Sequence, residues 1–248
     1  LKLLEYNVEK YRCIATEACR QVINPNFFIN KVKQISGIDV EIISSYEEAK
    51  LSLKSCKIYT EKIGNKGFIF DIGGGSTELT YFDIHKQTFE TRSISFGVIN
   101  LSEKREIFGK KIVENELRGH FGSFKKDLSE NLESELYSIG SCSTITSLCA
   151  IHQKLKFFDY KKIESYEMTS FELLSSIDFI KSLSTSELKK LPCVKSRYNL
   201  LINGVEILKF ILQMIPIKKV IVTQKGLRDG IMDDLVLQYE KNKIKKKT

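Results

Sequence analysis

The sequence has no tryptophan, only three prolines and three histidines, and no pair of cysteines spaced as C-x-x-C. The histidines lack the spacing of metal ligands, which argues against a zinc site and against a histidine-based catalytic triad. The six cysteines lie mostly in apolar stretches, as reduced, buried residues of a cytosolic protein do. No apolar run is long enough to span a membrane, and the first residues are too charged for a signal peptide. We therefore expect a cytoplasmic protein with no membrane partner.

The length and the net charge of the chain limit which domains it can form and which ligands it can bind. The chain has 248 residues, 42% of them hydrophobic, which is enough for one large or two small domains. The formal net charge is +8, and part of it comes from a lysine-rich end that we interpret as a solvated, frayed tail. The moderately basic remainder suits a polyanionic ligand. No basic stripe interleaved with aromatics is present, so no nucleic acid partner is expected. The frequent Lys, Ile and Ser residues hint at an A/T-rich bacterial genome.

A glycine-rich loop in residues 67–82 gives the strongest functional signal. An apolar run ends in Asp71, three consecutive glycines follow, and Glu78 comes shortly after them. Glycines have no Cβ, so their backbone amides can converge on an anion. Asp71 and Glu78 are placed where carboxylates could hold a divalent metal beside that anion. The segment therefore predicts a phosphate site.

The residues after the glycines exclude two common phosphate-binding motifs. A dinucleotide fingerprint or a Walker A loop needs a helix at once, and Walker A also needs Gly-Lys-Ser/Thr. Here residues 77–82 are β-prone, a polar turn follows at 83–87, and residues 88–95 indicate another strand. The loop is thus expected inside a β-hairpin. An ordinary glycine hairpin turn is the alternative, although such turns normally need only one or two glycines.

Strands and helices alternate along the rest of the chain, which predicts an α/β protein. Further strands are expected at 11–15, 38–43, 135–139 and 218–223, and helices at 1–10, 26–36, 44–56, 101–135, 144–152, 198–215 and 226–239. Thr169 and Glu172 form a capping box that opens one more helix. The strand, Gly/Ser turn and helix N-terminus around Gly140 make a second plausible anion site.

Several segments in order resemble the exopolyphosphatase/guanosine pentaphosphatase (Ppx/GppA) phosphatase family. Residues 71–79 match its D-I-G-G-G-S-T-E-L loop without a mismatch. Similar motifs lie at 15–21, 41–50, 93–97, 140–146, 197–204 and 226–230. The resemblance implies an actin-like ATPase (RNase H-like) fold, with mixed sheets and flanking helices. It also implies a division into an N-terminal domain remainder at 1–58, a second domain at 59–226, and a C-terminal helix with a lysine-rich tail at 227–248.

The resemblance also implies roles for individual residues. Glu48 matches a glutamate that orients or deprotonates water, Arg20 an arginine near the phosphates, and Asp71 a catalytic carboxylate. Asp71 and Glu78 match the surroundings of a metal, which we expect to be Mg²⁺. The matched phosphate-binding residues are Gly73, Gly74, Gly75, Ser76, Thr77, Gly140, Ser141, Ser143 and Thr144. A purely structural alternative exists for Glu48, because Ser45-x-x-Glu48 also fits a capping box.

The sequence departs from the family pattern in several places. The family's first phosphate loop, D-x-G-S-N-S, is absent, so the first domain is incomplete. Either an upstream portion is missing from this chain or the protein is a degenerate remnant. Lys50 replaces the arginine that is usual in the family, and Ser143 replaces a glycine. Gln224-Lys225 replaces an acidic residue that is common before the Gly-Leu-Arg segment. None of these changes removes Glu48, Arg20 or Asp71.

The expected function is hydrolysis of terminal phosphoanhydride bonds of inorganic polyphosphate, with guanosine pentaphosphate as the second choice of substrate. A non-catalytic binder of polyphosphate or alarmone is one alternative, and an ATP-dependent member of the same superfamily is another. A homodimer is left open. An upstream, in-frame D-x-G-S-N-S would separate enzyme from remnant.

Overall fold

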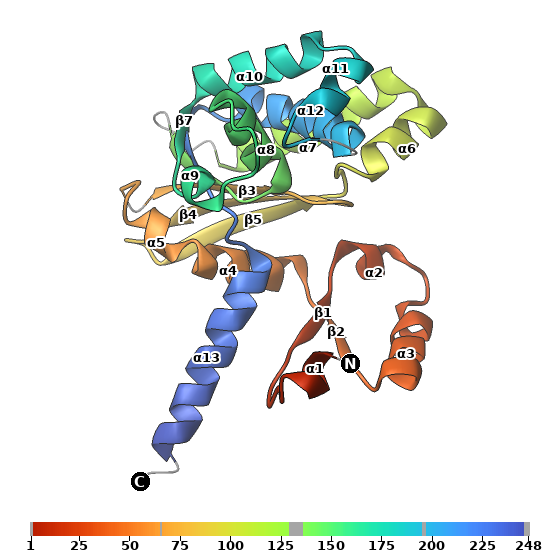
Figure 1. Ribbon diagram of the computed structural model, residues 1–248, viewed down its shortest axis with the longest axis vertical. Coiled ribbons are helices and arrows are strands. Elements are labelled where there is room, and N and C mark those ends of the chain that lie inside the picture. Colours follow the sequence, from red (N-terminus) through yellow and green to blue (C-terminus); the bar gives the residue numbers. More distant parts are fainter. Residues whose placement is uncertain (1, 65, 129–135, 195–196, 246–248) are drawn as a thin grey trace.

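The computed structural model describes residues 2–64, 66–128, 136–194 and 197–245. Its centre is a mixed sheet of six strands in the order β5-β4-β3-β6-β8-β7 (Figure 1). The strands are β3 (Lys66–Ile72), β4 (Thr77–Asp83), β5 (Thr88–Ile94), β6 (Leu136–Gly140), β7 (Glu167–Thr169) and β8 (Ile217–Val222). β3, β4 and β5 form an antiparallel meander, while β3, β6 and β8 run parallel. This confirms the α/β class and the hairpin around the glycine loop.

Helices cover both faces of this sheet, because its central strands are apolar on both sides. Phe68, Phe70 and Ile72 of β3 belong to the main core, whereas Ile69 faces the opposite, smaller cluster. This is the alternation expected of a strand buried on both faces. The helices on the main-core side are α6 (Asn100–Phe108), α7 (Lys110–Asp127), α8 (Ser143–His152), α9 (Tyr160–Ile163), α10 (Ser170–Ser182), α11 (Thr185–Lys190) and α12 (Tyr198–Met214).

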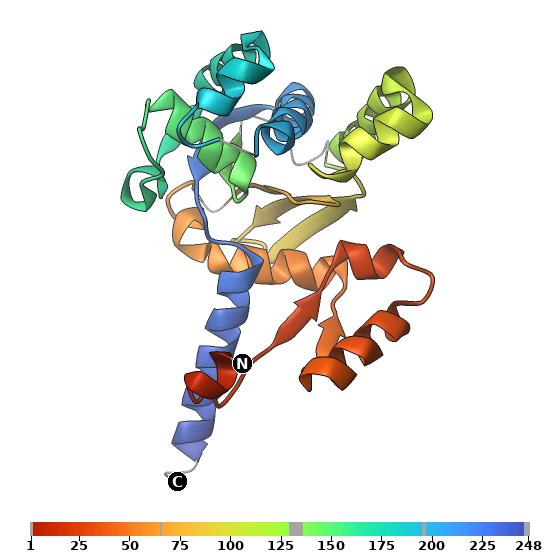
Figure 2. The ribbon, with the colours of Figure 1, turned by 45° about the vertical axis from the view of Figure 1, so that its right-hand side comes forward.

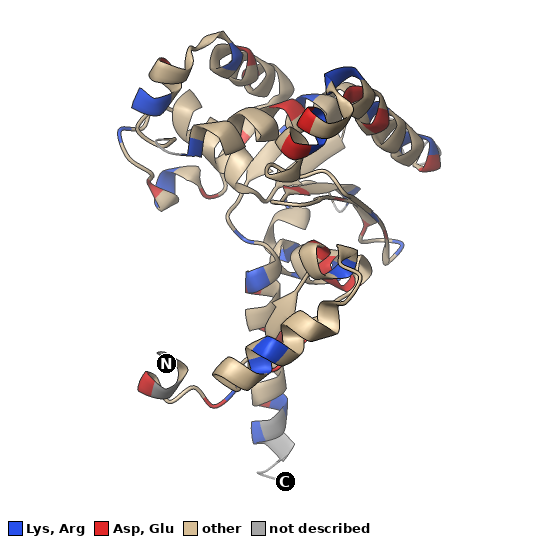
Figure 3. Ribbon diagram, turned by 90° about the vertical axis from the view of Figure 1, so that its right-hand side faces the viewer, with Lys and Arg blue, Asp and Glu red and all other residues tan. Residues whose placement is uncertain are grey.

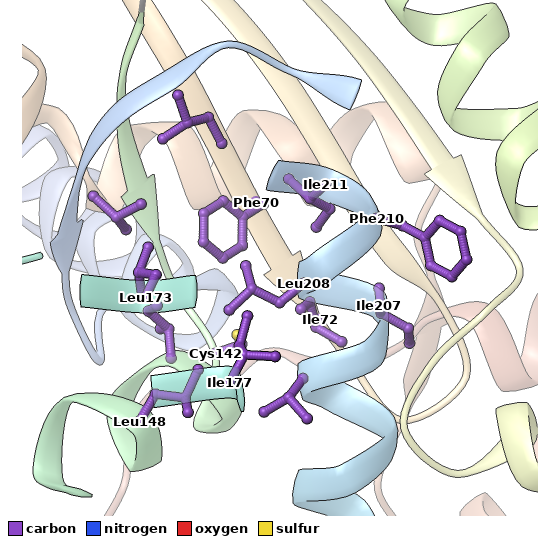
Figure 4. Close-up of a cluster of buried hydrophobic side chains, with 14 of the residues drawn as sticks. Phe70, Ile72, Cys142, Leu148, Leu173, Ile177, Ile207, Leu208, Phe210 and Ile211 are labelled. Carbon is purple, nitrogen blue, oxygen red and sulfur yellow. The ribbon is translucent and has the colours of Figure 1, made fainter. Parts of the chain in front are cut away.

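The main core forms where α12 lies across β3 (Figure 4). Ile207, Leu208 and Ile211 of α12 point toward Phe70 and Ile72 in this view, with side chains of α8 and α10 beside them. The labelled side chains are fully or almost fully removed from solvent. Burying a side chain of this size contributes about 1.5–3 kcal/mol, so this cluster fixes the position of β3 and of the loop that follows it.

The opposite face of the sheet is covered by α4 (Ser45–Ser55) and α5 (Lys57–Thr60). Beyond them lies a smaller unit made of α1 (Lys2–Glu5), β1 (Cys13–Ala15), α2 (Glu17–Gln21), α3 (Pro25–Ser36) and β2 (Val40–Ile42), in which β1 and β2 pair in parallel. The final helix α13 (Leu227–Lys245) extends away from the large sheet beside this unit (Figure 2). An apolar groove of ≈ 1010 Å³ runs between β1 and α13.

The path of α13 is set by close contact with α4. A Cβ at Gly230 would collide with the backbone of Leu51, so only glycine permits this crossing. Leu227, Ile231 and Leu235 of α13 pack with Ile43 and Leu51. On the face shown in Figure 3, basic and acidic residues are interspersed rather than gathered by sign.

Three of the expected elements differ from those observed. The helix expected at 1–10 covers only Lys2–Glu5, and Asn7 adopts a positive φ of 47°. The stretch expected as one helix at 101–135 is two helices, broken at Gly109 with φ 84°, and residues 129–135 lie outside the described residues. The lysine-rich end is helical as far as Lys245, not frayed from Tyr239, because lysine is a good helix former.

The capping box expected at the start of α10 is confirmed. The side chain of Thr169 caps α10 in a capping box with Glu172, and Gly37 ends α3 in the left-handed conformation. None of the six cysteines forms a disulfide, but the expectation that they are buried holds only for Cys56, Cys142 and Cys149, because Cys13, Cys19 and Cys193 are partly exposed. Among the described helices, none has the length and apolarity needed to cross a membrane.

Candidate active site

Two carboxylates face each other across the first hairpin. Asp71 near the end of β3 and Glu78 near the start of β4 are register partners, so their side chains lie on the same face of the sheet. That face is the one covered by α4. Oε1 of Glu78 accepts hydrogen bonds from Oγ of Ser76 at 2.6 Å and of Ser93 at 2.9 Å. No hydrogen bond from a described residue reaches the carboxylate of Asp71.

Burial makes both carboxylates weak acids. Burial, followed by the charges of Glu78 and Glu48, raises the pKa of Asp71 well above its usual value. Burial is the main cause, and the charge of Glu48 the second cause, of a rise in the pKa of Glu78 to about 7. The hydrogen bonds from Ser76 and Ser93 lower the pKa but do not offset this rise. Acidic groups held this close are costly without a counter-charge, which is a common mark of a functional site.

Glu48 on α4 and Arg20 on α2 of the smaller unit form an ion pair near these two carboxylates. Glu48 lies in the first turns of α4, and its Oε2 is 2.9 Å from Nη1 of Arg20 on α2. The same Nη1 donates to the carbonyl oxygen of Ile43 at 3.0 Å, and Nη2 is 3.0 Å from Oε2 of Glu17. Burial raises the pKa of Glu48 even though Arg20 opposes the shift. A carboxylate with a raised pKa is suited to accept a proton from water near neutral pH.

The capping-box interpretation of Ser45 and Glu48 is wrong. The helix begins one residue earlier than that interpretation requires, with Ser44 as the N-cap in an extended conformation. Oγ of Ser44 accepts from the backbone N–H of Glu47 at 3.1 Å, so Glu47 occupies the position assigned to Glu48. The Glu48 side chain has no capping role here and pairs with Arg20 instead.

Glu17 ties the smaller unit to the large sheet, which sequence reasoning missed. Its Oε1 accepts from Oγ of Ser95 at 2.7 Å, and Nε2 of Gln21 donates to the same Ser95 hydroxyl at 2.9 Å. Burial alone would raise the pKa of Glu17, but the hydrogen bonds from Ser95, Gln21 and Arg20 lower it on balance. Glu17 is therefore charged at neutral pH and fixes the guanidinium of Arg20.

The glycine turn is packed closely, and none of its three glycines has a positive φ: a Cβ would lie 3.2 Å from the Ser76 carbonyl at Gly73 and 3.1 Å from Ile99 at Gly74, but only in ordinary contact at Gly75. The backbone N–H of Gly73 donates to the carbonyl of Ser76 at 2.9 Å, closing the turn. The carbonyls of Gly73 and Gly74 accept from Val98 and Ile99 at 2.9 and 2.8 Å. A Cβ at Gly97 would collide with the Gly74 carbonyl, so the segment after β5 lies directly on the loop.

The hydroxyl groups of the residues that follow the glycines form hydrogen bonds within the loop and to its neighbours. Oγ1 of Thr77 is fully buried and donates to the carbonyl of Phe96 at 2.6 Å, and Ser76 is bound to Glu78. These contacts hold the loop in shape. The phosphate-binding role predicted for Ser76, Thr77 and Gly75 stays a prediction.

The second loop follows β6 and lies beside the first. The backbone N–H of Ser141 donates to the carbonyl of Phe70 at 3.0 Å, and Thr223 donates to the carbonyl of Gly140 at 3.0 Å. Ser143 begins α8, whose first amides are free of intrahelical partners and can bind an anion. Thr144 is buried beneath α12, where a Cβ at Gly204 would collide with it.

A cleft of ≈ 660 Å³ opens between the two loops. Asp71 lies at its inner end, and Gly73, Gly74, Ser141 and Ser143 line it. The other predicted residues do not line the cleft: Glu78 and Glu48 lie close enough for their charges to act on Asp71, and Arg20 is bound to Glu48. Gly75, Ser76, Thr77, Gly140 and Thr144 belong to the loops but do not line the cleft either. The lining also includes Phe158, Cys193, Arg197, Leu200 and Gln224.

The donor set limits how a metal could bind. No group of three His, Cys, Asp or Glu residues suited to a metal ion occurs among the residues described. Mg²⁺, however, is usually held by one or two carboxylates together with substrate phosphates and water. Asp71, which lacks a hydrogen-bond donor, and Glu78 beside it fit that mode of binding, whereas a closed all-protein cage does not fit.

Comparison with known proteins agrees with this arrangement. A family model described as the Ppx/GppA phosphatase family matches residues 2–239. The chain belongs to the Ppx/GppA phosphatase family. The Aquifex aeolicus member of this family has a crystal structure that superposes with a TM-score of 0.75 at 25% identity, over 96% of this chain and 78% of that one. An exopolyphosphatase-like protein superposes with a TM-score of 0.80 at 19% identity, which shows the same fold. The fold is the actin-like ATPase fold, as expected.

Curated relatives carry related names. A bifunctional 3-dehydroquinate synthase/phosphatase of Fusobacterium nucleatum is 28% identical over 96% of this chain and 36% of its own length. A guanosine-5'-triphosphate,3'-diphosphate pyrophosphatase of Vibrio atlanticus is 23% identical over 100% of this chain and 49% of its own length. Exopolyphosphatase 2 of Mycobacterium tuberculosis is 23% identical over 68% of this chain and 55% of its own length. The chain thus spans from about a third to just over half of these relatives.

Proposed function

We propose that this Ppx/GppA chain hydrolyses terminal phosphoanhydride bonds, with inorganic polyphosphate as substrate and guanosine pentaphosphate as the second choice. The observation that supports this most strongly is Glu48, which is largely buried with a raised pKa and whose charge raises the pKa of Asp71, the carboxyl group that lines the cleft between the two loops. A general base, an anion cradle and flanking carboxylates are the parts that phosphoryl transfer to water needs.

Each part has a distinct task. The backbone amide of Gly74, since that of Gly73 is bound to the Ser76 carbonyl, and the amides of the Ser143 helix end would bind the oxygens of the terminal phosphate. Glu48 would accept the proton of the attacking water, and Arg20 would hold Glu48 in position through the 2.9 Å contact. Mg²⁺, when bound by Asp71 and Glu78, would neutralise charge on the phosphate oxygens.

The division of the chain is proposed on the same basis. The packing of α13 on α4 supports grouping residues 227–248 with the lobe at 1–58, while residues 59–226 form the lobe of the large sheet. A cytoplasmic location is also proposed, supported by six cysteines that form no disulfide. Burial raises the pKa of Cys56 and of Cys142 to about 12, which keeps both thiols protonated and unreactive.

Orthophosphate release tests the proposal. The complete gene product is incubated with Mg²⁺ and long-chain polyphosphate, guanosine pentaphosphate or ATP, and Glu48→Gln serves as the matched variant. We expect release from polyphosphate or pentaphosphate and a loss of about 10²–10⁴-fold in kcat for the variant, the usual contribution of a general base. Binding without release would favour a non-catalytic binder. Release from ATP alone would favour an ATP-dependent member of the superfamily.

A further inference from the structure

Gln224 lines the cleft with a side-chain amide whose nitrogen has no hydrogen-bond partner among the described residues. Its side chain lines the cleft together with Asp71, Gly73 and Ser143. Its Nε2 is removed from solvent and has no hydrogen-bond partner among the described residues. An amide donor in that condition costs about 1–3 kcal/mol. A half-turn of the terminal amide exchanges its nitrogen and oxygen, so the N–H groups can also be presented to the cleft.

The loop that carries Gln224 is held rigidly by one carboxylate, Glu164, at the end of α9. Oε2 of Glu164 accepts from the backbone N–H of Gln224 at 3.0 Å, and Oε1 accepts from Oγ1 of Thr223 at 2.6 Å. The hydroxyl of Tyr59 donates to the same carboxylate. Three donors from two segments, Tyr59 on α5 and the adjacent Thr223 and Gln224, thus converge on Glu164, which fixes the start of the crossing from β8 to α13.

The other end of the same loop, at Lys225 and Gly226, lies close to Ser141 of the second loop and to Asp71 of β3. Oγ of Ser141 donates to the carbonyl of Lys225, and a Cβ at Gly226 would come within 3.9 Å of Oδ2 of Asp71. Gln224 is therefore placed at a fixed distance from Asp71 and from the second phosphate loop. A side chain placed in this way contributes to recognition because little freedom is lost when it binds.

We propose that Gln224 determines specificity by donating a hydrogen bond to a phosphate oxygen of the bound polyanion, and that Glu164 is the residue that positions it. The proposal rests on the proposed function of the site, which it extends to a particular contact. A neutral amide suits this place because one carboxyl group, that of Asp71, already lines the same cleft. A carboxylate at position 224 would add repulsion against a phosphate chain.

The test compares Gln224→Met and Gln224→Glu with the wild type. Gln238→Met, which changes an exposed glutamine on α13, is the matched control. Calorimetry measures the Kd of inorganic tripolyphosphate at fixed Mg²⁺, and orthophosphate release from long-chain polyphosphate gives KM and kcat. We expect Gln224→Met to raise both Kd and KM about tenfold with kcat unchanged, because about 1.4 kcal/mol corresponds to a factor of ten. Gln224→Glu should raise Kd further. A Kd within twofold of the wild type for Gln224→Met would overturn the proposal.

Glu164 is tested by its coupling to Gln224. Glu164→Ala should weaken tripolyphosphate binding in the wild-type background but have little additional effect when Gln224 is already Met. Glu164→Gln keeps an acceptor for the backbone N–H and should restore most of the affinity. Fully additive effects would refute the positioning role. Because tripolyphosphate affinity needs no turnover, failure of the hydrolase proposal and failure of this one give different results.

Discussion

Neutralising Glu78 should stabilise the metal-free protein while removing its activity. The folded-state pKa of Glu78 is about 7, against an ordinary value of 4.5, mainly because of burial. The difference, 7 − 4.5, is 2.5 units, and each unit corresponds to about 1.36 kcal/mol, so ionising Glu78 costs about 3 kcal/mol of folding free energy. The folded state binds the proton more tightly than the unfolded state. The stabilisation of the folded state by protonated Glu78 is therefore fully present below pH 4.5 and is lost as the pH rises through 7.

Glu78→Gln removes this penalty and retains an oxygen that can accept from Ser76 and Ser93. Urea unfolding in EDTA at pH 5 and pH 8 measures the free energy of unfolding. The free energy of unfolding of the wild type should fall between pH 5 and pH 8. For Glu78→Gln the fall should be smaller by about 3 kcal/mol. Exposed Glu103→Gln is the control and should follow the wild type. If Glu78→Gln shows the wild-type pH dependence, the burial argument for the acidic pair is refuted.

Three further predictions concern the supports of the site. Gly204→Ala should destabilise the protein by about 1–3 kcal/mol in urea unfolding, because its Cβ collides with Thr144; an unchanged midpoint would contradict this. Arg20→Lys should lower kcat at least tenfold with little change in Tm, since lysine cannot reproduce the forked contacts to Glu48 and its neighbours; equal kcat values would exclude a positioning role. Asn203→Ala should lower the Tm, because its side chain donates to the Val98 carbonyl at 2.8 Å; a Tm equal to the wild type would show that this bond is dispensable.

The hairpin and the acidic residues beside it could be predicted because their signals are local. Three glycines between β-prone runs, with no helix signal after them, identify a turn between antiparallel strands. The burial of Asp71 and its registry with Glu78 depend on strand pairing, and the sequence showed only that both residues flank the loop.

The contacts of Glu17 and Glu164 could not be predicted because their partners are far away in the sequence. Ser95 lies 78 residues from Glu17, and Thr223 lies 59 residues from Glu164. Glu17 lies within the motif at 15–21 but at a position that the motif leaves open, Glu164 lies in no motif, and periodicity reports burial rather than pairing. The cleft residue Gln224 had been noted only as a departure from the family pattern.

The capping error at the start of α4 has a specific cause. Ser44 and Ser45 are adjacent, and Glu47 and Glu48 follow them, so two capping registers one residue apart fit the sequence equally well. Tertiary contacts decide between them. With Ser44 as the cap, Glu48 reaches Arg20, whose Nη1 also binds the Ile43 carbonyl.

Hydrolysis in water enriched in ¹⁸O tests the central claim most directly. The complete gene product is incubated with Mg²⁺ and long-chain polyphosphate, and mass spectrometry measures the label in the released orthophosphate and in the remaining chain. Attack of Glu48-activated water on the terminal phosphorus places one ¹⁸O atom in each orthophosphate and none in the shortened chain. Orthophosphate without the label, or label at the new chain end, would contradict the account.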